Sequence, residues 1–396
     1  MTPKGSTACP PGTAVGFGRR AEIIATASAL IRQRGYHGVA LKDVAQAVGI
    51  TAPALYRHFP SKQALLVATI SDGLDVAENA AFDAHEGGLS AVIAGLARAA
   101  VDQRNLWMLL HRESRHLDDG ARALLGKRFA RLVEIIRSGI ATERAGIEAK
   151  QSGTLSRAIL AALSAPSQYL LSLPRVALAG ELTTVANRIR RMDVSPGEAP
   201  PPVTSHLRPP FDPGLDRREA ILAAASLLFA RRGYHAVTVD EIGAAVSIAG
   251  PSIYNHFRGK SEILAGVLWR SIDWIESDVT RAIASHAPAG QALHQLYADY
   301  ADLAVRHREL FDVFTIEGAH LSASERDRIG RAHGAFVDRW VSLLRRMRLD
   351  MSPGAARAQV CASLCVINDL SRTDRFRGDR TDGPRLAAIA SAAIGL

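Results

Sequence analysis

Apolar residues recur along the chain at the spacing of α-helices. Near the start, Ile23, Ile24, Ala27, Leu30 and Ile31 follow this spacing, and Leu65, Leu66, Thr69 and Ile70 follow it again. Residues three or four positions apart lie on one face of a helix, so each set forms an apolar stripe. No sustained alternation of apolar and polar residues, which would indicate strands, occurs in the sequence. The chain is therefore predicted to be all-α.

The helical pattern occurs twice in register. The segment RRAEIIATASALIRQRGYHGVALKDVAQAVGITAPALYRHFPSKQALL, from Arg19, aligns without a gap on RREAILAAASLLFARRGYHAVTVDEIGAAVSIAGPSIYNHFRGKSEIL, from Arg217, at an offset of 198 positions. Further on, Glu113 and His116 have counterparts in Glu317 and His320 at an offset of 204. The duplication therefore extends through both halves of the chain.

Residues 194–214 separate the copies and hold seven of the chain's 18 prolines. Proline cannot continue a helix and favours extended spacers. The predicted organisation is a flexible tail at 1–16, a helix-turn-helix domain at 17–63, a helical domain at 64–193, the linker at 194–214, a second helix-turn-helix domain at 215–261 and a second helical domain at 262–396.

Local signals place a helix-turn-helix in the first copy. Gly35 suits the end of a long helix from about Gly18. A second helix is expected over 41–48, followed by a turn at Gly49. Thr51 can cap a third helix over 52–57, and Pro53 is tolerated in its first turn. This third helix is short and exposed at its front, as reading the DNA major groove requires.

The candidate DNA-contacting residues surround this third helix and its counterpart. Tyr56 could instead be a core aromatic, the histidines could cap or pack, and the lysines could mark solvated helix starts; Phe59 and Phe257 are predicted to be core. The candidates are Arg19, Arg20, Lys42, Thr51, Ala52, Pro53, Ala54, Tyr56, Arg57, His58 and Lys62 in the first copy, and Arg217, Arg218, Ala249, Gly250, Ser252, Tyr254, Asn255, His256 and Lys260 in the second.

The runs GITAPALYRHFPSKQALL and GPSIYNHFRGKSEIL resemble the DNA-binding domain of the tetracycline-repressor (TetR) family. The motif is a tyrosine, a phenylalanine three residues later and a lysine three residues after that, behind a short two-helix unit. It covers about 50 residues of each copy, roughly a quarter of the chain in all. The resemblance implies all-helical repressors whose larger domain binds a small ligand. The tandem arrangement also resembles mycobacterial-type regulators of lipid- or sterol-uptake operons.

The two copies differ in the residues around the third helix, which would contact the bases of DNA. In the first copy, Ala40 stands where a capping hydroxyl is expected; the second has Thr238 there, with Glu241 three residues on, which predicts a capping box. The second copy has Ser247 at the turn and Ala249 at the third-helix cap, each an expected local cost of up to about 1 kcal/mol. Its third helix should be less well pre-formed, and the two domains should prefer different bases.

Composition adds further constraints. The 48 Lys and Arg against 39 Asp and Glu give a net charge of +9, which favours a polyanion such as DNA as partner. Three cysteines are too few for a disulfide framework in 396 residues, and Cys361 and Cys365 are expected to be buried thiols. No run of about 18 uncharged apolar residues is present. We expect a bacterial cytoplasmic protein associated with the nucleoid, with no membrane partner.

Nothing in the sequence indicates catalysis. It has neither a nucleophile-elbow pattern nor a phosphate-binding glycine loop. His111, Glu113 and His116 come nearest to a metal site, but a spacing of five residues points the two imidazoles to different helical faces. No enzymatic activity, metal or cofactor is therefore predicted.

Two reading domains in one chain predict an intramolecular pseudo-dimer. Homodimeric regulators need two linked domains to bind two half-sites. The expected contact between the copies involves helices around Ile159, Leu160, Leu163, Val360, Leu364 and Ile367. Further homodimerisation, which would give four reading domains, stays open at this stage.

Both helical domains are long and apolar enough to hold a ligand between helices. The aromatic residues among the candidates could instead be plain core, and Glu113 and Glu317 could form structural ion pairs. The candidate lining residues are Leu106, Trp107, Leu110, His111 and Glu113 in the first copy and Leu310, Phe311, Phe314, Glu317 and His320 in the second. The expected ligand is apolar: a lipid, a sterol or an acyl thioester.

The sequence thus predicts a DNA-binding transcriptional regulator, a ligand-released repressor that recognises double-stranded operator DNA without symmetry, with a role in lipid or sterol metabolism or transport. The alternative is an architectural DNA-binding protein without ligand control. The alternative predicts strong salt dependence and little discrimination between sequences.

Overall fold

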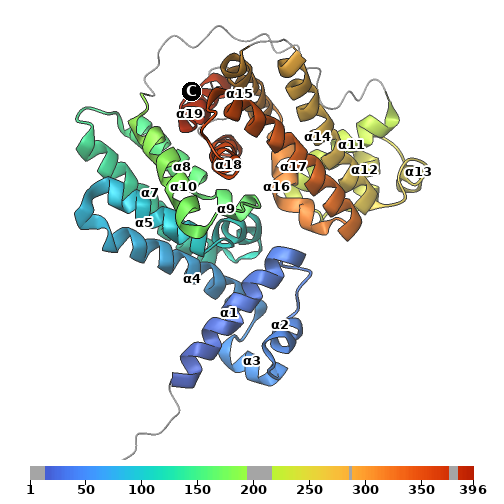
Figure 1. Cartoon of the computed structure of the whole chain (residues 1–396). Helices are drawn as coiled ribbons and strands as arrows, with labels where there is room; N and C mark the ends of the chain where they lie inside the picture. Colours follow the sequence, from blue (N-terminus) through green and yellow to red (C-terminus); the bar gives the residue numbers. More distant parts are fainter. Residues whose placement is uncertain (1–13, 194–215, 285–287, 374–381) are drawn as a thin grey trace, which may run out of the picture.

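A computed structural model describes residues 14–193, 216–284, 288–373 and 382–396. Throughout these ranges the regular secondary structure is helical, and no strand is found, which confirms the all-α prediction (Figure 1). The predicted linker lies outside the described residues, as does most of the predicted tail. No helix in these ranges has the length and apolar character needed to cross a membrane.

The first predicted helix-turn-helix domain, which we call head 1, consists of α1 (Ala14–Arg34), α2 (Leu41–Val48) and α3 (Ala52–His58). Gly35 and Gly49 end the first two helices in the left-handed region, with φ of 70° and 74° respectively. A glycine avoids the strain that a side chain causes there. The helix α1 begins at Ala14, earlier than expected, so the predicted tail overlaps it. Leu55 and Phe59 are buried and attach α3 to the domain.

The remainder of the first half is a helical bundle, which we call body 1. It begins with α4 (Lys62–Asp83), which continues from head 1 into the bundle. Its other elements are η1 (His85–Gly87), α5 (Gly88–Asp102), α6 (Leu106–Met108), the π-helical turn η2 (Leu109–Glu113), η3 (Ser114–His116), α7 (Asp119–Glu143), α8 (Ala149–Leu163), α9 (Ala165–Gln168) and α10 (Arg175–Arg191).

The second half repeats this order. Its reading domain, head 2, consists of α11 (Arg217–Arg232), α12 (Val239–Ala245) and α13 (Gly250–Ile253). Its bundle, body 2, consists of α14 (Lys260–Ala284), α15 (Ala289–Arg306), α16 (Arg308–Glu317), η4 (Gly318–His320), α17 (Ala323–Met347), α18 (Pro353–Leu370) and α19 (Asp382–Ala393). From α15 onward the second half keeps the offset that relates Glu113 to Glu317, so α17 and α18 are the counterparts of α7 and α8.

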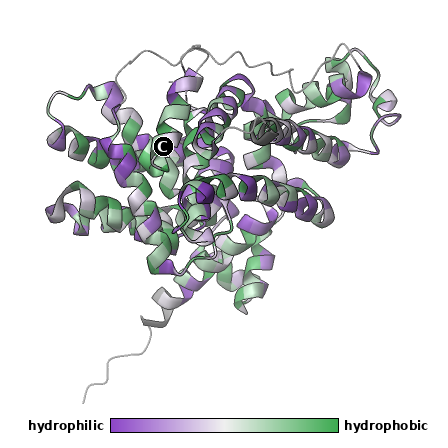
Figure 2. Ribbon diagram, turned by 45° about the horizontal axis from the view of Figure 1, so that its top comes forward, coloured by the Kyte–Doolittle hydropathy of each residue, from purple (hydrophilic) through white to green (hydrophobic). Residues whose placement is uncertain are grey.

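The two bodies pack against each other through α8, α10, α18 and α19. The six residues predicted for this contact are all buried, three on α8 and three on α18, so the intramolecular pseudo-dimer is confirmed. Polar groups also cross the contact: Arg188 donates to Gln359 at 2.8 Å, and Gln359 donates to Glu181 at 2.6 Å. Cys361 and Cys365 are buried free thiols on α18. Figure 2 shows hydrophobic and hydrophilic residues along the same helices, as amphipathic helices require.

Candidate DNA interface and effector cavity

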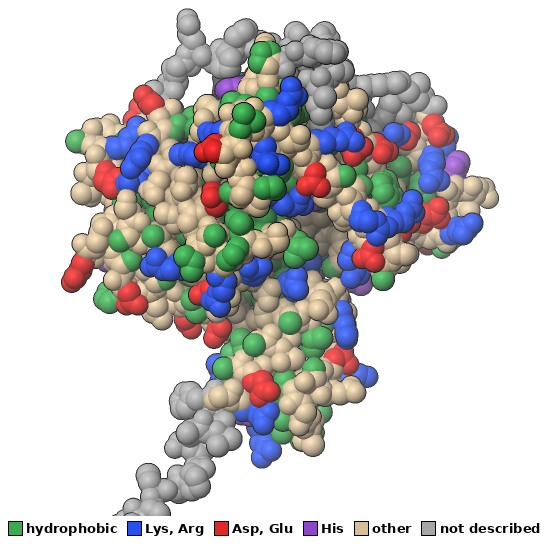
Figure 3. Space-filling view, in the orientation of Figure 1, with side chains coloured by type: hydrophobic (Ala, Val, Ile, Leu, Met, Phe, Trp, Pro, Cys, Tyr) green, Lys and Arg blue, Asp and Glu red, His purple; other side chains and the backbone are tan. Residues whose placement is uncertain are grey.

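The front of α3 is capped and exposed. The Thr51 hydroxyl accepts a hydrogen bond from the Ala54 amide at 3.4 Å, and Pro53 lies in the first turn. Tyr56 is 52% exposed and Arg57 is exposed beside it, while Leu55 is buried beneath them. Head 1 therefore projects away from the bodies with a short helix whose outer face is free of core contacts (Figure 3).

The equivalent helix of head 2 is less well formed. The helix α13 has four residues where α3 has seven, and Ala249 gives it no side-chain cap. Ser247 has a φ of 58°, the only positive value at a non-glycine residue in the described ranges. The predicted Thr238–Glu241 capping box on α12 is present. These features confirm that the two heads are built unequally.

The exposed faces of α3 and α13 carry different side chains at matched positions. Tyr254 is 59% exposed, like Tyr56, and Asn255 is exposed where head 1 has Arg57. Lys42, exposed in head 1, corresponds to Asp240 in head 2. The Asp240 side chain lies so close to Gly250 that a side chain there would collide with it. Head 2 thus presents fewer positive charges near its reading helix.

The arginines that begin α1 and α11 make matched contacts in both heads. Arg19 and Arg217 donate to the backbone carbonyls of Val48 and Val246, at 3.4 Å and 3.1 Å. Arg20 lies over the Phe59 ring, and Arg218 lies over the Phe257 ring at 4.0 Å. Phe59 and Phe257 are buried core residues, as predicted. These arginines attach the first helix of each head to the end of its reading unit.

Lys62 and Lys260 are turned inward. The Lys62 ammonium lies 4.2 Å from the centre of the Tyr36 ring, and the Lys260 ammonium lies 4.5 Å from that of Tyr234. Lys260 also donates to the carbonyls of Tyr234 and Val237 at 2.8 Å and 2.7 Å. Burial lowers the pKa of both lysines. This geometry ties each lysine to its own head and disfavours the predicted phosphate contact.

Four histidines and two tyrosines meet where the heads join the bodies. His37 of head 1 lies 4.9 Å from His235 of head 2, measured between ring centres. His116 stacks on Tyr36 at 5.0 Å, and His320 stacks on Tyr234 at 5.2 Å. We call this set the histidine cluster: Tyr36, His37, His116, Tyr234, His235 and His320. It connects both heads and both bodies.

Burial, with the positive charges and histidines around them, lowers the pKa of His116 and of His320 to about 3. Burial also lowers the pKa of His37 and His235. The four rings are therefore neutral near pH 7. No group of three or more side chains suited to holding a metal ion is found in the described ranges, this cluster included.

Two buried glutamates, Glu113 and Glu317, lie beside the cluster. Each pairs with an arginine, one from its own half and the other from the opposite half. Glu113 accepts from Arg112 at 2.6 Å and from the Tyr36 amide at 3.2 Å. Its counterpart Glu317 accepts from Arg115 of the opposite half at 2.5 Å and 3.2 Å. Glu113, Glu317 and His320, predicted to line a ligand site, are not among the residues that line the cavity described below. The two carboxylates hold ion pairs, as the alternative allowed, and the imidazole packs on tyrosine.

Arg112 links body 1 to the end of α1. It donates to the carbonyls of Ile31 and Arg32 at 3.0 Å and 3.2 Å. Both carbonyls belong to the last turn of α1, and the Ile31 carbonyl also accepts a hydrogen bond from the Gly35 amide at 2.8 Å. Arg112 acts from the π-helical turn η2, a distortion that is frequent at functional sites. The position of head 1 therefore depends on η2.

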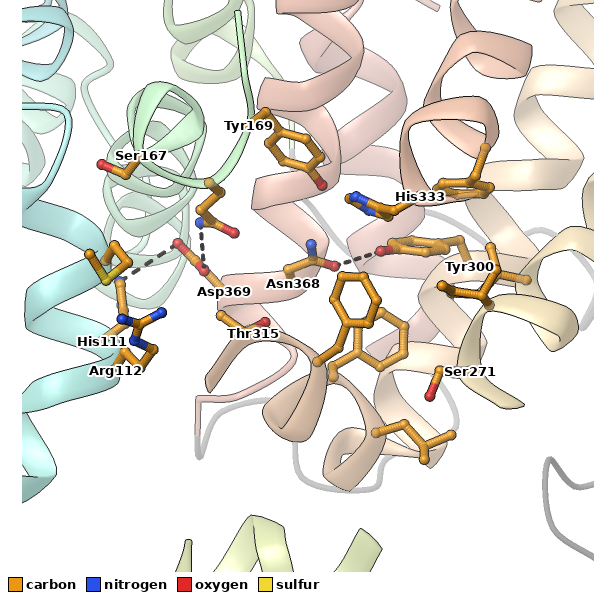
Figure 4. Close-up of a pocket in the computed structure, with 18 of the residues that line it drawn as sticks. His111, Arg112, Ser167, Tyr169, Ser271, Tyr300, Thr315, His333, Asn368 and Asp369 are labelled. Atoms are coloured by element: carbon orange, nitrogen blue, oxygen red, sulfur yellow. Dashed lines mark hydrogen bonds and ion pairs between the residues drawn. The ribbon is translucent and has the colours of Figure 1, made fainter. Parts of the chain in front are cut away.

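A cavity of about 260 Å³ lies between the two halves. Figure 3 shows a hollow in this region, and Figure 4 shows side chains reaching into the cavity from both halves. Body 2 supplies most of the apolar wall, including the candidates Leu310, Phe311 and Phe314, together with Trp274 and Phe336. Body 1 closes the other side with Trp107, Met108, His111, Gln168 and Tyr169, and Arg112 lies at this edge.

Polar groups lie at defined places on the cavity wall. Tyr300 donates to Asn368 at 2.9 Å, and the Asp369 carboxylate lies 3.8 Å from the His111 imidazole. His333 stacks beside Tyr169 with ring centres 5.5 Å apart, and Figure 4 shows it between Tyr169 and Tyr300. Burial, and Arg357 nearby, lower the pKa of His333 to about 4. The cavity is thus largely aromatic, with a few uncharged polar groups and one carboxylate, that of Asp369.

Comparison with known proteins identifies the heads. The family described as bacterial regulatory proteins, tetR family, matches residues 23–69 and 221–267. The chain carries two tetR-family domains. The matched residues run from within α1 and α11 to the first turns of α4 and α14, so each tetR-family domain includes its α3 or α13 helix.

Relatives of these tetR-family domains occur among mycobacterial regulators. The HTH-type transcriptional activator FasR of Mycolicibacterium smegmatis is 36% identical over 87 residues, which are 22% of this chain and 40% of that protein. The HTH-type transcriptional repressor KstR2 of Mycobacterium tuberculosis is 27% identical over 110 residues, 28% of this chain and 55% of that protein. The chain thus matches about half, or less, of the length of these two relatives.

Solved structures of tetR-family regulators resemble about half of the chain. A regulator from Bordetella parapertussis is 17% identical with a TM-score of 0.43, over 46% of this chain and 95% of that one. The ketosteroid transcriptional regulator KstR2 of Mycobacterium tuberculosis is 23% identical with a TM-score of 0.40, over 45% of this chain and 94% of that one.

The ligand candidates of the two halves lie in different places. Trp107, His111, Leu310, Phe311 and Phe314 line the cavity. Leu106 instead lines a void of about 10 Å³ inside body 1, and Leu110 packs against the core. Sequence reasoning missed Arg112, Arg115, Tyr169, His333, Asn368 and Asp369. The sequence Arg-Gly-Tyr-His occurs at 34–37 and again at 232–235. The sequence does not show that the histidines of the two copies contact each other.

Proposed function

We propose that this chain is a DNA-binding transcriptional regulator, a repressor that reads an operator without symmetry through two unlike heads and is released by a small apolar ligand. The observation that carries the proposal is the pair of exposed reading helices held in one chain with different side chains at matched positions. The two tetR-family domains support DNA as the partner. KstR2 is named a repressor and FasR an activator, and we propose repression for this chain.

The first turns of α3 and α13 make most of the contacts with bases. Side chains there approach base edges in the major groove, while flanking hydroxyls and cations bind phosphate. In head 1, Thr51 and Tyr56 offer hydroxyls and Arg57 a guanidinium. In head 2, Asn255 and Ser252 offer neutral donors and acceptors. An arginine favours guanine and an asparagine favours adenine, so the half-sites should differ in sequence.

The covalent linkage of the two heads supports recognition of two different half-sites. In a homodimer both half-sites must suit one reading helix, whereas in this chain the two helices are free to differ. The linked heads also have a high effective concentration for each other, so binding does not require assembly of two chains.

Ligand control is supported by the path from the cavity to the heads. The turn η2 lines the cavity with His111 and Arg112, and Arg112 holds the end of α1. On the other side α16 lines the cavity with Phe311 and packs against α11 of head 2. A ligand that moves either segment would change the spacing of the heads. Such a ligand binds the DNA-free arrangement more tightly and shifts the population towards it.

Selection of bound sequences from random DNA with the full chain tests the reading proposal. We expect two different half-sites at a fixed spacing. Arg57→Asn gives head 1 the residue of head 2, and it should change one half-site only. Arg98→Asn, at an exposed position on α5 outside head 1, is the matched control for charge. A perfect palindrome, or binding without sequence preference, would refute the proposal.

Ligand control is tested on the selected operator by gel shift. The probes are androst-4-ene-3,17-dione, a neutral ketosteroid, and decanoic acid, which is anionic at pH 7. We expect the neutral compound to release the DNA. Arg112→Gln removes the contact with α1 and should reduce release of the DNA; because Arg112 also borders the cavity, binding of the probe to this variant is measured separately without DNA. If no apolar probe affects the complex, ligand control is refuted and an architectural role is favoured.

A further inference from the structure

The two bodies differ in the space that they enclose. Body 2 borders the cavity of about 260 Å³, whereas the matching region of body 1 holds a void of about 10 Å³. That void is lined by Gly73, Leu96 and Leu106 among others, the counterparts of Ser271, Tyr300 and Leu310 around the large cavity. The Leu106 side chain lies against Gly73 so closely that a methyl group at position 73 would collide with it. Body 1 has no room for a second ligand at the equivalent place.

Body 1 also lacks the polar groups that face the cavity of body 2. Phe129 stands at the position of His333, Leu96 at that of Tyr300 and Ala165 at that of Asp369. A polar side chain on an apolar wall orients a ligand by hydrogen bonding. Neither ring nitrogen of His333 has a hydrogen-bond partner among the described residues, so both are available to a molecule in the cavity.

The charges around the cavity exclude an anion. Among the lining residues, the only acid is Asp369, and its carboxylate has weak partners: Ser164 at 3.4 Å, Gln168 at 3.5 Å and His111 at 3.8 Å. Arg112 is already paired with Glu113 at 2.6 Å. The remaining cation, Arg32, is exposed at the rim. A carboxylate or phosphate inside would lose its hydration without gaining a free cation, and it would lie near Asp369.

Residues of body 1 complete the cavity. Tyr169 is almost fully buried and stacks on His333 of the opposite half. Gln168 and His111 approach Asp369, which belongs to α18 of body 2 (Figure 4). A molecule in the cavity therefore touches both halves at once.

We propose that the cavity binds a single uncharged apolar molecule per chain, bearing a hydroxyl, carbonyl or amine that hydrogen-bonds with His333, and that body 1 has lost its own site. The proposal rests on the proposed function, in which this cavity is the effector site. It narrows the effector class to neutral compounds and the stoichiometry to one.

Two probes with one carbon skeleton test the class. N-phenyl-1-naphthylamine is uncharged at pH 7, and 1-anilinonaphthalene-8-sulfonate is the same molecule with a sulfonate. Fluorescence titration of the full chain without DNA should give one saturable site per chain for the neutral probe and at least tenfold weaker binding of the sulfonate. Two equivalent sites for the neutral probe, or equal or tighter binding of the sulfonate, would overturn the proposal.

Variants locate the site. Thr315→Trp fills the cavity from α16 and should abolish binding of the neutral probe, while Thr184→Trp adds the same side chain at an exposed position on α10 and should not. His333→Phe installs the residue found in body 1 and removes both ring nitrogens while keeping a flat aromatic ring, so it should weaken binding of the neutral probe at least threefold even if Thr315→Trp fails to fold. Unchanged binding in His333→Phe and in a folded Thr315→Trp would overturn the assignment.

The probe titration tests the ligand site, and the operator experiments test the regulatory function, so the two can fail independently. Loss of DNA binding in a chain that still binds one neutral probe refutes the regulatory function and leaves the site intact. A chain that binds its operator but takes up two probes, or prefers the sulfonate, refutes the inference alone.

Discussion

Arg115 of body 1 donates two hydrogen bonds to Glu317 of body 2, across the contact between the halves, at 2.5 Å and 3.2 Å. Glu317 is 1% exposed, and Gly233 of head 2 lies directly against the Arg115 guanidinium. In body 2, Ile316 and Ala319 occupy the positions of Arg112 and Arg115. Both arginines that hold the glutamates therefore come from body 1, and the pseudo-dimer is asymmetric at the point where the heads attach.

Arg115→Ala should destabilise the chain strongly. Removing one partner of a buried ion pair leaves the Glu317 carboxylate buried without its counter-charge, which typically costs about 3 kcal/mol or more. Partial exposure of Arg115 makes the lower end of that range the expected value for the loss of unfolding free energy in urea. Arg137→Ala removes an arginine from the exposed pair with Glu134 and should have little effect. Equal behaviour of the two variants would show that the inter-half pair contributes nothing specific.

Ser247→Gly should stabilise head 2. The serine holds a φ of 58°. This conformation costs a residue with a side chain roughly 1 kcal/mol and a glycine far less. We expect a gain of about 1 kcal/mol and slower hydrogen exchange over 239–258. Gly49→Ser in head 1 is the reciprocal change and should cost a similar amount. A loss of stability in Ser247→Gly would contradict the strain argument.

Tyr56→Phe should weaken DNA binding without changing stability. The tyrosine is more than half exposed, and its hydroxyl is placed to donate to a phosphate. Loss of one such hydrogen bond corresponds to about 1 kcal/mol, roughly a fivefold loss of affinity. Binding measured by fluorescence anisotropy, with urea unfolding as control, checks this. Tyr254→Phe should have the smaller effect, because α13 is less well formed.

The histidine cluster should make the chain less stable as the pH falls below neutrality. In the unfolded chain His116 and His320 accept protons near pH 6.5, whereas in the folded chain their pKa of about 3 keeps them neutral. Protons therefore bind preferentially to the unfolded state between about pH 6.5 and 3, and each histidine removes up to about 1.4 kcal/mol per pH unit in that window. His37 and His235 act in the same direction. Arg115, Lys62 and Lys260 oppose protonation of the rings, and Glu113 and Glu317 favour it.

Urea unfolding at pH 7, 6 and 5 measures this loss. The double variant His116→Gln with His320→Gln should be less stable at pH 7 but should lose less stability on acidification. Wild-type stability that stays constant from pH 7 to pH 5 would contradict the prediction.

Local chemistry made much of the fold predictable. Helical spacing, the glycines after α1 and α2, the Thr51 cap and the register of the repeat are properties of neighbouring residues, and they located both heads and the expected inequality of α3 and α13. The contact between α8 and α18 was also predictable, because unbroken apolar faces at matched positions in two copies must be buried somewhere.

The tertiary structure decided what depends on residues distant in sequence. Glu113 and Glu317 occupy equivalent places in the repeat, yet one pairs within its own half and the other across the interface, because only body 1 carries the arginines. The cavity likewise depends on whether Leu106 fills the space beside Gly73 and on which side chains Tyr169 meets from the opposite half. A repeat in sequence specifies two similar folds. The packing of side chains within and between the copies decides that body 2 borders a cavity while the matching region of body 1 is filled.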